Sequence, residues 1–141
     1  MLDKKMISEL IGRAIQARKN AYAPYSGYCV GAALLCDDGQ IFTGCNVENA
    51  SYGATNCAER TAVFKAVSEG AQRFSAIAIA GGKQGSNMLD MAYPCGVCRQ
   101  VLREFGVPAE MQIIVCRSES DYRILTLEQL LPDSFGPDNL I

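Results

Sequence analysis

Three short, unbroken apolar runs restrict the fold of this 141-residue chain more than any other feature of its sequence. They are CVGAALLC at residues 29–36, FSAIAIA at residues 74–80 and MQIIVC at residues 111–116. Each run has the length of a buried strand and is far shorter than the roughly 18 apolar residues that a membrane-spanning helix needs. We therefore expect a protein without membrane spans, in which these runs form buried strands.

Helical patterns separate the apolar runs along the chain. Residues 4–20 repeat apolar side chains at helical spacing, and residues 57–69 carry an apolar stripe that ends before Gly70, which is placed to cap a helix. Residues 95–105 form a third predicted helix, with a proline at its entry and a glycine after its last turn.

Turn chemistry completes the expected topology. The strand-like residues 28–36 and 40–47 flank Asp38 and Gly39, and an Asp-Gly pair is typical of a tight antiparallel hairpin. Residues 121–131 have the pattern of a short strand that leads into a short helix. Helices that alternate with strands after an initial hairpin predict an α/β fold with a mixed sheet covered by helices.

The composition is that of a soluble globular protein, with 49% hydrophobic and 20% charged residues. The net charge of -2 argues against a protein that binds nucleic acid, because that affinity depends on clustered lysine and arginine. The first 20 residues alternate charged and apolar side chains and lack the unbroken apolar core of a secretion signal. We expect a single domain over residues 1–141 that works in the cytoplasm.

Seven cysteines are many for such a chain, and a reducing compartment disfavours structural disulfides between them. Four lie in or beside apolar runs and are expected to be small buried hydrophobes: Cys29, Cys36, Cys45 and Cys116. Cys57, Cys95 and Cys98 remain to be explained by chemistry.

Cys95 and Cys98 are three residues apart at the start of a predicted helix, so both side chains lie on one face and can reach one ion. A lone CxxC pattern is equally typical of a redox dithiol. Cys57, also at a predicted helix start, has no place in a simple dithiol but completes a set of three metal ligands. Three protein ligands and a water are the arrangement of catalytic zinc, whereas a fourth cysteine would make the site structural.

Glu59 follows Cys57 by two residues, and two interpretations fit it. Asn56 and Glu59 have the spacing of an approximate capping box, in which the glutamate bonds back to the backbone. Alternatively, Cys57 and Glu59 meet beyond the helix end, because side chains two apart on a helix point about 200° away from each other. A water on the metal would lie there, and Glu59 would then be a general base and acid.

Three thiolates leave a zinc ion with a net negative charge, which a nearby cation should offset. Two arginines are near the proposed ligands in the sequence. Arg60 follows Glu59 and Arg99 follows Cys98. Either arginine is able to donate hydrogen bonds to a sulfur and to draw charge off the metal.

CAE at residues 57–59 and PCGVC at residues 94–98 match the zinc-deaminase signature, with cysteine in place of the first histidine. With YAPYSGYCVGAALL and GCNVENASYGATNCAERTAVFKAVSEG, they resemble the small homotetrameric, three-cysteine cytidine deaminases over nearly the whole chain. The resemblance implies a three-layer α/β fold, in which helices cover both faces of a mixed five-stranded sheet. It also implies one Zn2+ per subunit on the three cysteines, and hydrolytic deamination of cytidine and deoxycytidine to uridine and deoxyuridine in pyrimidine salvage.

The same resemblance implies roles for single residues. Glu59 would be the catalytic proton shuttle, and Arg60 would bond the zinc thiolates. Asn46 and Glu48 match the pair that binds the ribose hydroxyls, although as residues of a polar loop they also suit a turn. The backbone amide of Ala58 matches a contact to the pyrimidine carbonyl.

Three aromatic residues complete the implied site. Tyr28 stands beside the base, where many relatives have phenylalanine. Tyr52 and Phe135 match positions that neighbouring subunits contribute, which implies a homotetramer with shared active sites. The loop at residues 81–93 is longer than in some relatives.

Two kinds of alternative function remain. A related deaminase would act on a nucleoside antibiotic such as blasticidin S or on a base within RNA; the Asn46 and Glu48 pair opposes the first and the net charge opposes the second. A protein of another class would use the cysteines for structural zinc or thiol-redox chemistry and would not need Glu59.

Overall fold

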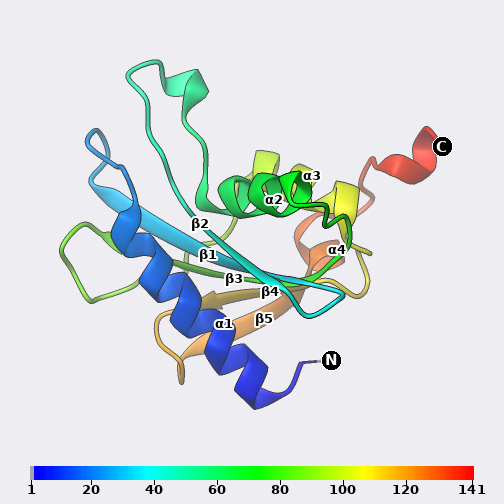
Figure 1. Cartoon of the computed structure of the whole chain (residues 1–141), viewed down its shortest axis with the longest axis horizontal. Coiled ribbons are helices and arrows are strands. Elements are labelled where there is room, and N and C mark those ends of the chain that lie inside the picture. The colour runs from blue at the N-terminus through cyan, green and yellow to red at the C-terminus, as the bar shows by residue number, and fades with distance from the viewer. Residues whose placement is uncertain (1) are drawn as a thin grey trace.

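The computed structural model describes residues 2–141 and contains a five-stranded sheet in the order β2-β1-β3-β4-β5 (Figure 1). The strands are Tyr28–Cys36 (β1), Ile41–Cys45 (β2), Phe74–Lys83 (β3), Gln112–Cys116 (β4) and Tyr122–Thr126 (β5). The pair β3 and β4 is parallel, and the other neighbours are antiparallel. The sheet is therefore mixed, as the sequence predicts.

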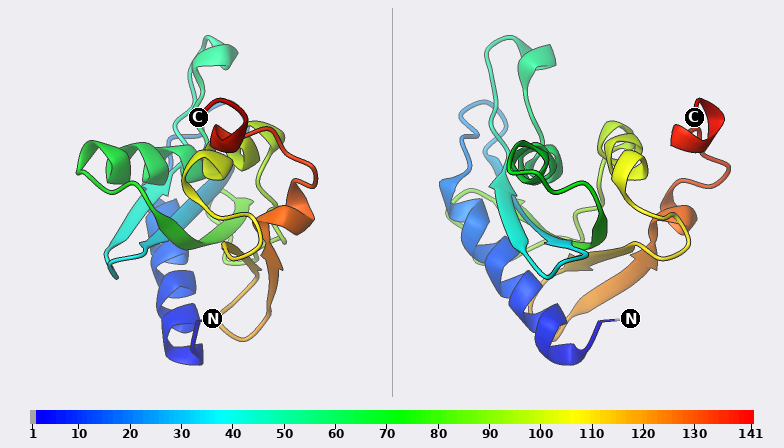
Figure 2. Two further views of the ribbon diagram at one scale, coloured as in Figure 1. Left: turned by 90° about the vertical axis from the view of Figure 1, so that its right-hand side faces the viewer. Right: turned by 45° about the vertical axis from the view of Figure 1, so that its right-hand side comes forward.

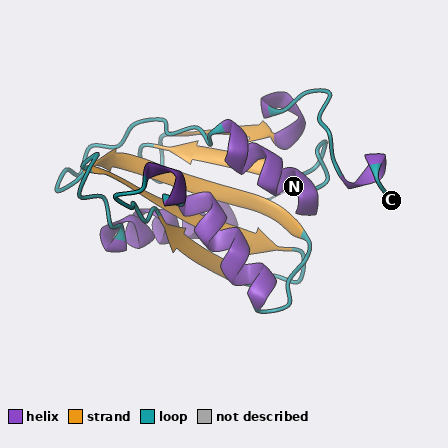
Figure 3. Cartoon of the chain, turned by 90° about the horizontal axis from the view of Figure 1, so that it is seen from above, coloured by secondary structure: helices purple, strands orange, loops and turns teal. Residues whose placement is uncertain are grey.

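Helices lie on both sides of this sheet, which gives the molecule three layers (Figures 1 and 3). They are Lys4–Ala17 (α1), Ala58–Ser68 (α2), Gly96–Phe105 (α3) and Leu127–Leu130 (α4). α1 packs on one face of the sheet, and α2 and α3 pack on the other. The predicted fold class is confirmed. Within residues 2–141, none of the helices has the length and apolar character needed to cross a bilayer.

Two buried clusters explain why the strand sequences are unbroken apolar runs. Along β1, Ala33 and Leu35 face the cluster under α1, whereas Ala32 and Leu34 face the cluster under α2. Successive side chains of a strand point to opposite faces, so a strand with helices over both faces must be apolar at every position. Apolar and polar residues therefore do not alternate along this strand, because helices cover both faces of the sheet.

The ends of the elements differ in detail from the sequence expectation. The first helix is α-helical only to Ala17 and continues as a 3-10 turn to Asn20. The strand expected at residues 40–47 ends at Cys45, while β3 runs on to Lys83, where it pairs with the start of β1. Pairing with a long neighbour extends β3 into glycines that have little strand propensity of their own.

The expected hairpin between β1 and β2 is present. Leu35 pairs with Ile41, and Gly39 in the turn has a φ of 92°. That backbone conformation suits glycine, because a side chain there would be strained. Two further segments stand out from the body of the molecule, the turn Tyr52–Ala54 and the C-terminal turn Pro137–Asn139 (Figure 2).

Gly31 allows α1 and β1 to approach closely, which yields a first prediction. A Cβ atom on Gly31 would lie 2.0 Å from the Ala14 carbonyl oxygen and 2.4 Å from the Arg18 backbone nitrogen. We expect Gly31→Ala to lower the free energy of unfolding by about 3 kcal/mol, because the backbone of a packed helix has to move. Urea denaturation followed by circular dichroism at fixed protein concentration measures this change.

Gly53→Ala is the matched control, since no heavy atom beyond its two chain neighbours lies within 4 Å of the added methyl position. Its unfolding free energy should change by less than about 0.5 kcal/mol. Equal effects of the two substitutions would contradict the close approach of α1 to β1.

Candidate metal centre

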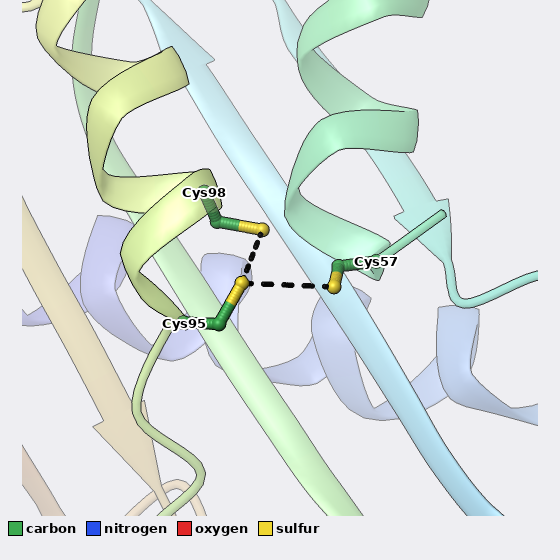
Figure 4. Close-up of side chains that lie close together, drawn as sticks. All are labelled: Cys57, Cys95 and Cys98. Atoms are coloured by element: carbon green, nitrogen blue, oxygen red, sulfur yellow. Dashed lines mark hydrogen bonds between the residues drawn. The ribbon is translucent and has the colours of Figure 1, made fainter. Parts of the chain in front are cut away.

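Three cysteine sulfurs meet where the N-termini of α2 and α3 come together (Figure 4). Cys57 is the N-cap residue of α2, Cys95 is the N-cap residue of α3, and Cys98 lies in the first turn of α3. The Sγ atoms of Cys57 and Cys95 are 3.9 Å apart, and those of Cys95 and Cys98 are 3.5 Å apart. Neither N-cap side chain accepts a capping hydrogen bond from the backbone of its own helix, and both sulfurs point to the shared centre.

The spacing of the sulfurs fits zinc. A tetrahedral ion with Zn–S bonds of about 2.3 Å places its thiolates about 3.8 Å apart, and the two observed distances lie on either side of that value. The positive ends of two helix dipoles favour thiolate over thiol at this point. The donor set and its geometry therefore suit a zinc ion with three cysteine ligands.

The other cysteines do not join this cluster. Among residues 2–141, the only group of three or more ligating side chains near one another is Cys57, Cys95 and Cys98. Three of the remaining thiols are buried, as expected: Cys29, Cys36 and Cys116. The fourth, Cys45, is half-buried. A closed, four-cysteine structural site is therefore not formed by this chain.

Arg60 is the cation that contacts the cluster, through the sulfur of Cys57. Its Nη2 donates a hydrogen bond to Cys57 Sγ at 3.2 Å. The neighbouring Cys98 thiol and then the Arg60 guanidinium stabilise the thiolate, which holds the pKa of Cys57 well below its ordinary value. Arg99 instead donates to the backbone oxygens of Pro94 and Leu130, each at 2.7 Å. Of the two arginines that the sequence leaves open, Arg60 is the one in place to offset thiolate charge.

Glu59 is buried beside the cluster, with 5% of its surface exposed. Burial raises the pKa of its carboxyl to about 7. At neutral pH, a group with this pKa accepts and releases a proton with equal ease. The capping-box interpretation is wrong: the N-cap of α2 is Cys57, and the Asn56 side chain donates instead to Thr61 Oγ1 at 3.1 Å. Glu59 is thus left to face the cavity in front of the sulfurs.

A cavity of about 490 Å³ opens in front of the cysteines. Cys57, Cys95 and Glu59 line one part of it, together with Ala58 of the first α2 turn. Its polar lining residues away from the sulfurs come from the segments that flank β1 and follow β2: Ser26, Asn46, Glu48 and Thr55. Val30, Ile79 and Ala92 supply apolar walls. An apolar slot with polar groups at its ends suits a small ligand that is itself partly flat and partly polar.

The two polar residues expected to bind a sugar are held in different ways. The Asn46 side chain donates to the Tyr28 carbonyl oxygen and accepts from the Val30 amide, both at 2.8 Å, and so fastens the chain after β2 to β1. Glu48 accepts hydrogen bonds from the Ser26 hydroxyl and from the amides of Ser26 and Tyr25. The Ser26 side chain in particular holds the pKa of Glu48 below its ordinary value, so this carboxylate is charged at neutral pH.

The three aromatic residues fall into two groups. Tyr28 lines the cavity, and its hydroxyl donates to Asp90 Oδ2 at 3.1 Å. Tyr52 is 75% exposed and lies beside Tyr25, with ring centroids 6.0 Å apart. Phe135 is 59% exposed on the C-terminal segment. Neither Tyr52 nor Phe135 lines the cavity of its own chain.

Sequence reasoning missed Ser26, Asp90 and Tyr93 as residues of the site. Ser26 and Tyr93 line the cavity, and Asp90 holds Tyr28. Two sequence features could have indicated these residues, namely the turn-forming PYSG segment and the length of the loop before α3. Both features are typical of loops that carry functional residues.

Comparison with known proteins agrees with this geometry. Residues 4–114 match the family profile described as the cytidine and deoxycytidylate deaminase zinc-binding region. Among curated relatives, the cytidine deaminase of Sporosarcina psychrophila is 44% identical over 134 residues, which is 95% of this chain and 94% of the relative. A cytidine deaminase of Mycobacterium tuberculosis is 48% identical over 131 residues, which is 93% of this chain and 90% of the relative.

Solved structures also resemble the fold. The cytidine deaminase of Burkholderia pseudomallei superposes with a TM-score of 0.80 at 48% identity, over 90% of this chain and 97% of that one. The cytidine deaminase of Mycobacterium tuberculosis gives a TM-score of 0.76 at 45% identity, over 96% of this chain and 99% of that one. Together with the cysteine cluster, the family match identifies a zinc site in this protein.

The ligand set makes a direct prediction about metal content. We expect Cys98→Ala to reduce bound zinc from stoichiometric to trace amounts, because two thiolates at a partly exposed site hold zinc far more weakly than three. Cys36→Ala, at a buried cysteine outside the cluster, should keep its zinc. Elemental analysis of the purified variants measures the ratio, and full zinc in Cys98→Ala would refute the assignment.

Arg60 has a separate expected effect. Arg60→Gln removes the positive charge next to Cys57. We expect it to lower zinc affinity by about 10- to 100-fold, as is usual for the loss of groups that support metal ligands. Competition with a chelating dye measures zinc affinity. Arg99→Gln is the control: it should change stability but not zinc affinity, and equal losses of zinc affinity in both variants would show that the Arg60 contact has no special role.

Proposed function

The chain belongs to the cytidine and deoxycytidylate deaminase family, and we propose that it converts cytidine and deoxycytidine to uridine and deoxyuridine by zinc-dependent hydrolysis. One observation carries the proposal: a buried glutamate with a pKa of about 7 stands beside three convergent thiols at a cavity of nucleoside size. In the reaction, water adds to the base and ammonia leaves, so no redox partner is needed.

The cavity suits a nucleoside in one orientation. A pyrimidine between the apolar walls would place its amino group toward Glu59 and its sugar toward Asn46 and Glu48. The backbone amide of Ala58 belongs to the first turn of α2, where amides have no partner within the helix. It is a suitable donor for the pyrimidine carbonyl, and the charged Glu48 is a suitable acceptor for sugar hydroxyls.

Glu59 carries the protons in the proposed mechanism. Zinc held by the three thiolates would act as a Lewis acid and make a water molecule a better nucleophile toward ring C4. Glu59 takes a proton from that water and delivers it to ring N3. It then takes the remaining proton from the oxygen added to C4 and passes it to the amino group, so that the C4–N bond breaks, ammonia leaves and the C4 carbonyl forms. A carboxyl whose pKa lies near neutrality is suited to both directions of transfer.

We also propose that the protein is a homotetramer whose subunits share active sites. The support is the exposure of two aromatic rings, Tyr52 and Phe135, that do not touch the cavity of their own chain. α2 and α3 also carry exposed apolar side chains, namely Phe64 and Val97. Large apolar side chains that a chain leaves exposed are available to be covered by other subunits.

Hydrogen bonds fix the C-terminal segment to α3, so that Phe135 is held in a position from which it could reach a neighbouring subunit. Gln100 of α3 donates to the Phe135 backbone oxygen at 2.9 Å. Arg103 donates to Ser134 Oγ at 2.9 Å and pairs with Asp138 at 3.5 Å. These contacts fix the segment to the helix that carries Cys98 while its phenylalanine ring stays exposed.

We infer further that residues 1–141 form one domain, which acts in the cytoplasm in pyrimidine salvage.

A protein with only structural zinc or a redox dithiol is the alternative from another class. It would not need a buried carboxyl beside the thiols, because neither role moves a proton between water and a substrate. The same consideration applies to the cavity, which a structural zinc site does not require.

The test of function is the Glu59→Gln variant. We expect it to keep stoichiometric zinc and to lose activity by about 10²- to 10⁴-fold or more, since it removes general acid and base catalysis. Ultraviolet absorbance follows the loss of cytidine. Glu69→Gln at the exposed end of the same helix is the matched control and should remain active.

A substrate panel completes this test: cytidine, deoxycytidine, cytosine and blasticidin S, each with zinc-loaded wild-type protein. Turnover of the two nucleosides and not of the others supports the proposal. Inactivity on all four compounds with zinc present would overturn it.

A further inference from the structure

The segment before α3 forms one wall of the nucleoside cavity. Ala92 and Tyr93 line the cavity, and both belong to the loop that joins β3 to α3. Their position depends on how this loop is fastened, because no helix or strand carries them. Tyr93 has its own support, since its hydroxyl accepts a hydrogen bond from Arg123 of β5 at 2.9 Å. The position of Ala92 depends on other contacts.

The root of the loop is tied to the end of α1. The guanidinium of Arg18, only 8% exposed, donates to the backbone oxygens of Gly82, Lys83 and Ser86 at 2.9, 3.0 and 3.2 Å. A fourth bond runs to the Cys29 oxygen at 3.1 Å. These contacts fix the loop as far as Ser86, and the part that reaches the cavity must be held further on.

Asp90 supplies that second attachment. Its backbone amide donates to the Gly81 oxygen at 2.8 Å, and its carboxylate accepts from the Tyr28 hydroxyl at 3.1 Å. Gly81 leaves room for this junction: a Cβ atom there would lie 2.8 Å from Ala92 Cβ and 3.1 Å from the Tyr28 oxygen. Tyr28, Asp90 and Ala92 therefore meet over one glycine of β3.

Only part of this junction touches the cavity. Tyr28 and Ala92 line it, whereas Asp90 does not. Asp90 thus acts through Tyr28, and we call the hydrogen bond between them the Tyr28–Asp90 latch. A phenylalanine in place of Tyr28 would fill the same wall without fastening the loop.

We propose that the Tyr28–Asp90 latch sets the width of the nucleoside cavity and so determines which pyrimidine bases the enzyme accepts. This role of the latch rests on the proposed function, which supplies the orientation of the base. With the base carbonyl at Ala58 of α2, ring C5 lies across the ring from that carbonyl and so points away from α2. The cavity wall outside α2 includes Ala92 and Tyr93, which we take as the wall that a substituent on C5 would meet. While the Tyr28–Asp90 hydrogen bond holds this wall in place, little space is left for a substituent on C5. When the bond is lost, the wall can move and accommodate the substituent.

The test compares cytidine with 5-iodocytidine as substrates of the zinc-loaded enzyme. Tyr28→Phe and Asp90→Ala should each raise the ratio of kcat/KM for 5-iodocytidine to kcat/KM for cytidine by about three- to tenfold, as expected for the loss of one hydrogen bond. Each should also raise KM for cytidine more than it lowers kcat. Because both variants are compared with the same two substrates, the intrinsic reactivity of the iodinated base cancels.

Three further variants separate the latch from general damage. The double variant of Tyr28→Phe with Asp90→Ala should have the same ratio as either single variant, since both break one bond. Asp90→Asn keeps an oxygen acceptor and should restore a ratio close to wild type. Asn87→Ala, at an exposed position of the same loop, should leave the ratio unchanged. Additive effects of the two single changes, or an unchanged ratio in both, would overturn the proposal.

A readout that does not depend on turnover keeps this inference distinct from the proposed function. The backbone amide of residue 90, which donates to the Gly81 oxygen, should exchange with deuterium faster in Asp90→Ala than in wild type, while Asp90→Asn stays protected. Equal exchange in Asp90→Ala and wild type would show that no latch exists. Normal latch behaviour in a protein that does not deaminate cytidine would instead refute the proposed function alone.

Discussion

The convergence of two helix N-termini on one point is the constraint on which the rest of the site depends. Three thiolates within 4.8 Å of one another repel, and they are stable together only where helix amides, a cation and a metal offset their charge. α2 and α3 each present an N-cap cysteine there, and Arg60 adds its guanidinium. The sheet supplies the rigid base that keeps the two helix ends together.

The first turn of α2 brings three successive residues to the cavity. Cys57 faces the other sulfurs, Ala58 offers a backbone amide, and Glu59 is buried beside both. The position of this turn is fixed by contact with β2, because a Cβ atom on Gly44 would lie 2.6 Å from the Ala58 oxygen. Close packing against a strand glycine thus fixes the position of the first turn of α2 on the sheet, which a looser contact would leave variable.

Much of the fold was predictable because local patterns carried it. Unbroken apolar runs predicted buried strands, the Asp-Gly pair predicted the hairpin, and the periodicity of residues 4–20 predicted the first helix. The Asn56 cap was predicted wrongly, since the side chain of Asn56 bonds to Thr61 and leaves the N-cap position to Cys57. The end of β3 was also missed, because pairing with β1 decides where that strand stops.

The sequence by itself determined the chemistry of the site: without histidine, the cysteines at two predicted helix starts were the available thiol ligands, and Glu59 stood next to one of them. Only the tertiary structure decided which arginine contacts sulfur, that Tyr28 is tied to Asp90, and that Phe135 is exposed outside the cavity of its own chain. The reason is physical. Helix and strand periodicity govern neighbours a few positions apart, whereas these contacts join residues brought together by the packing of separate elements.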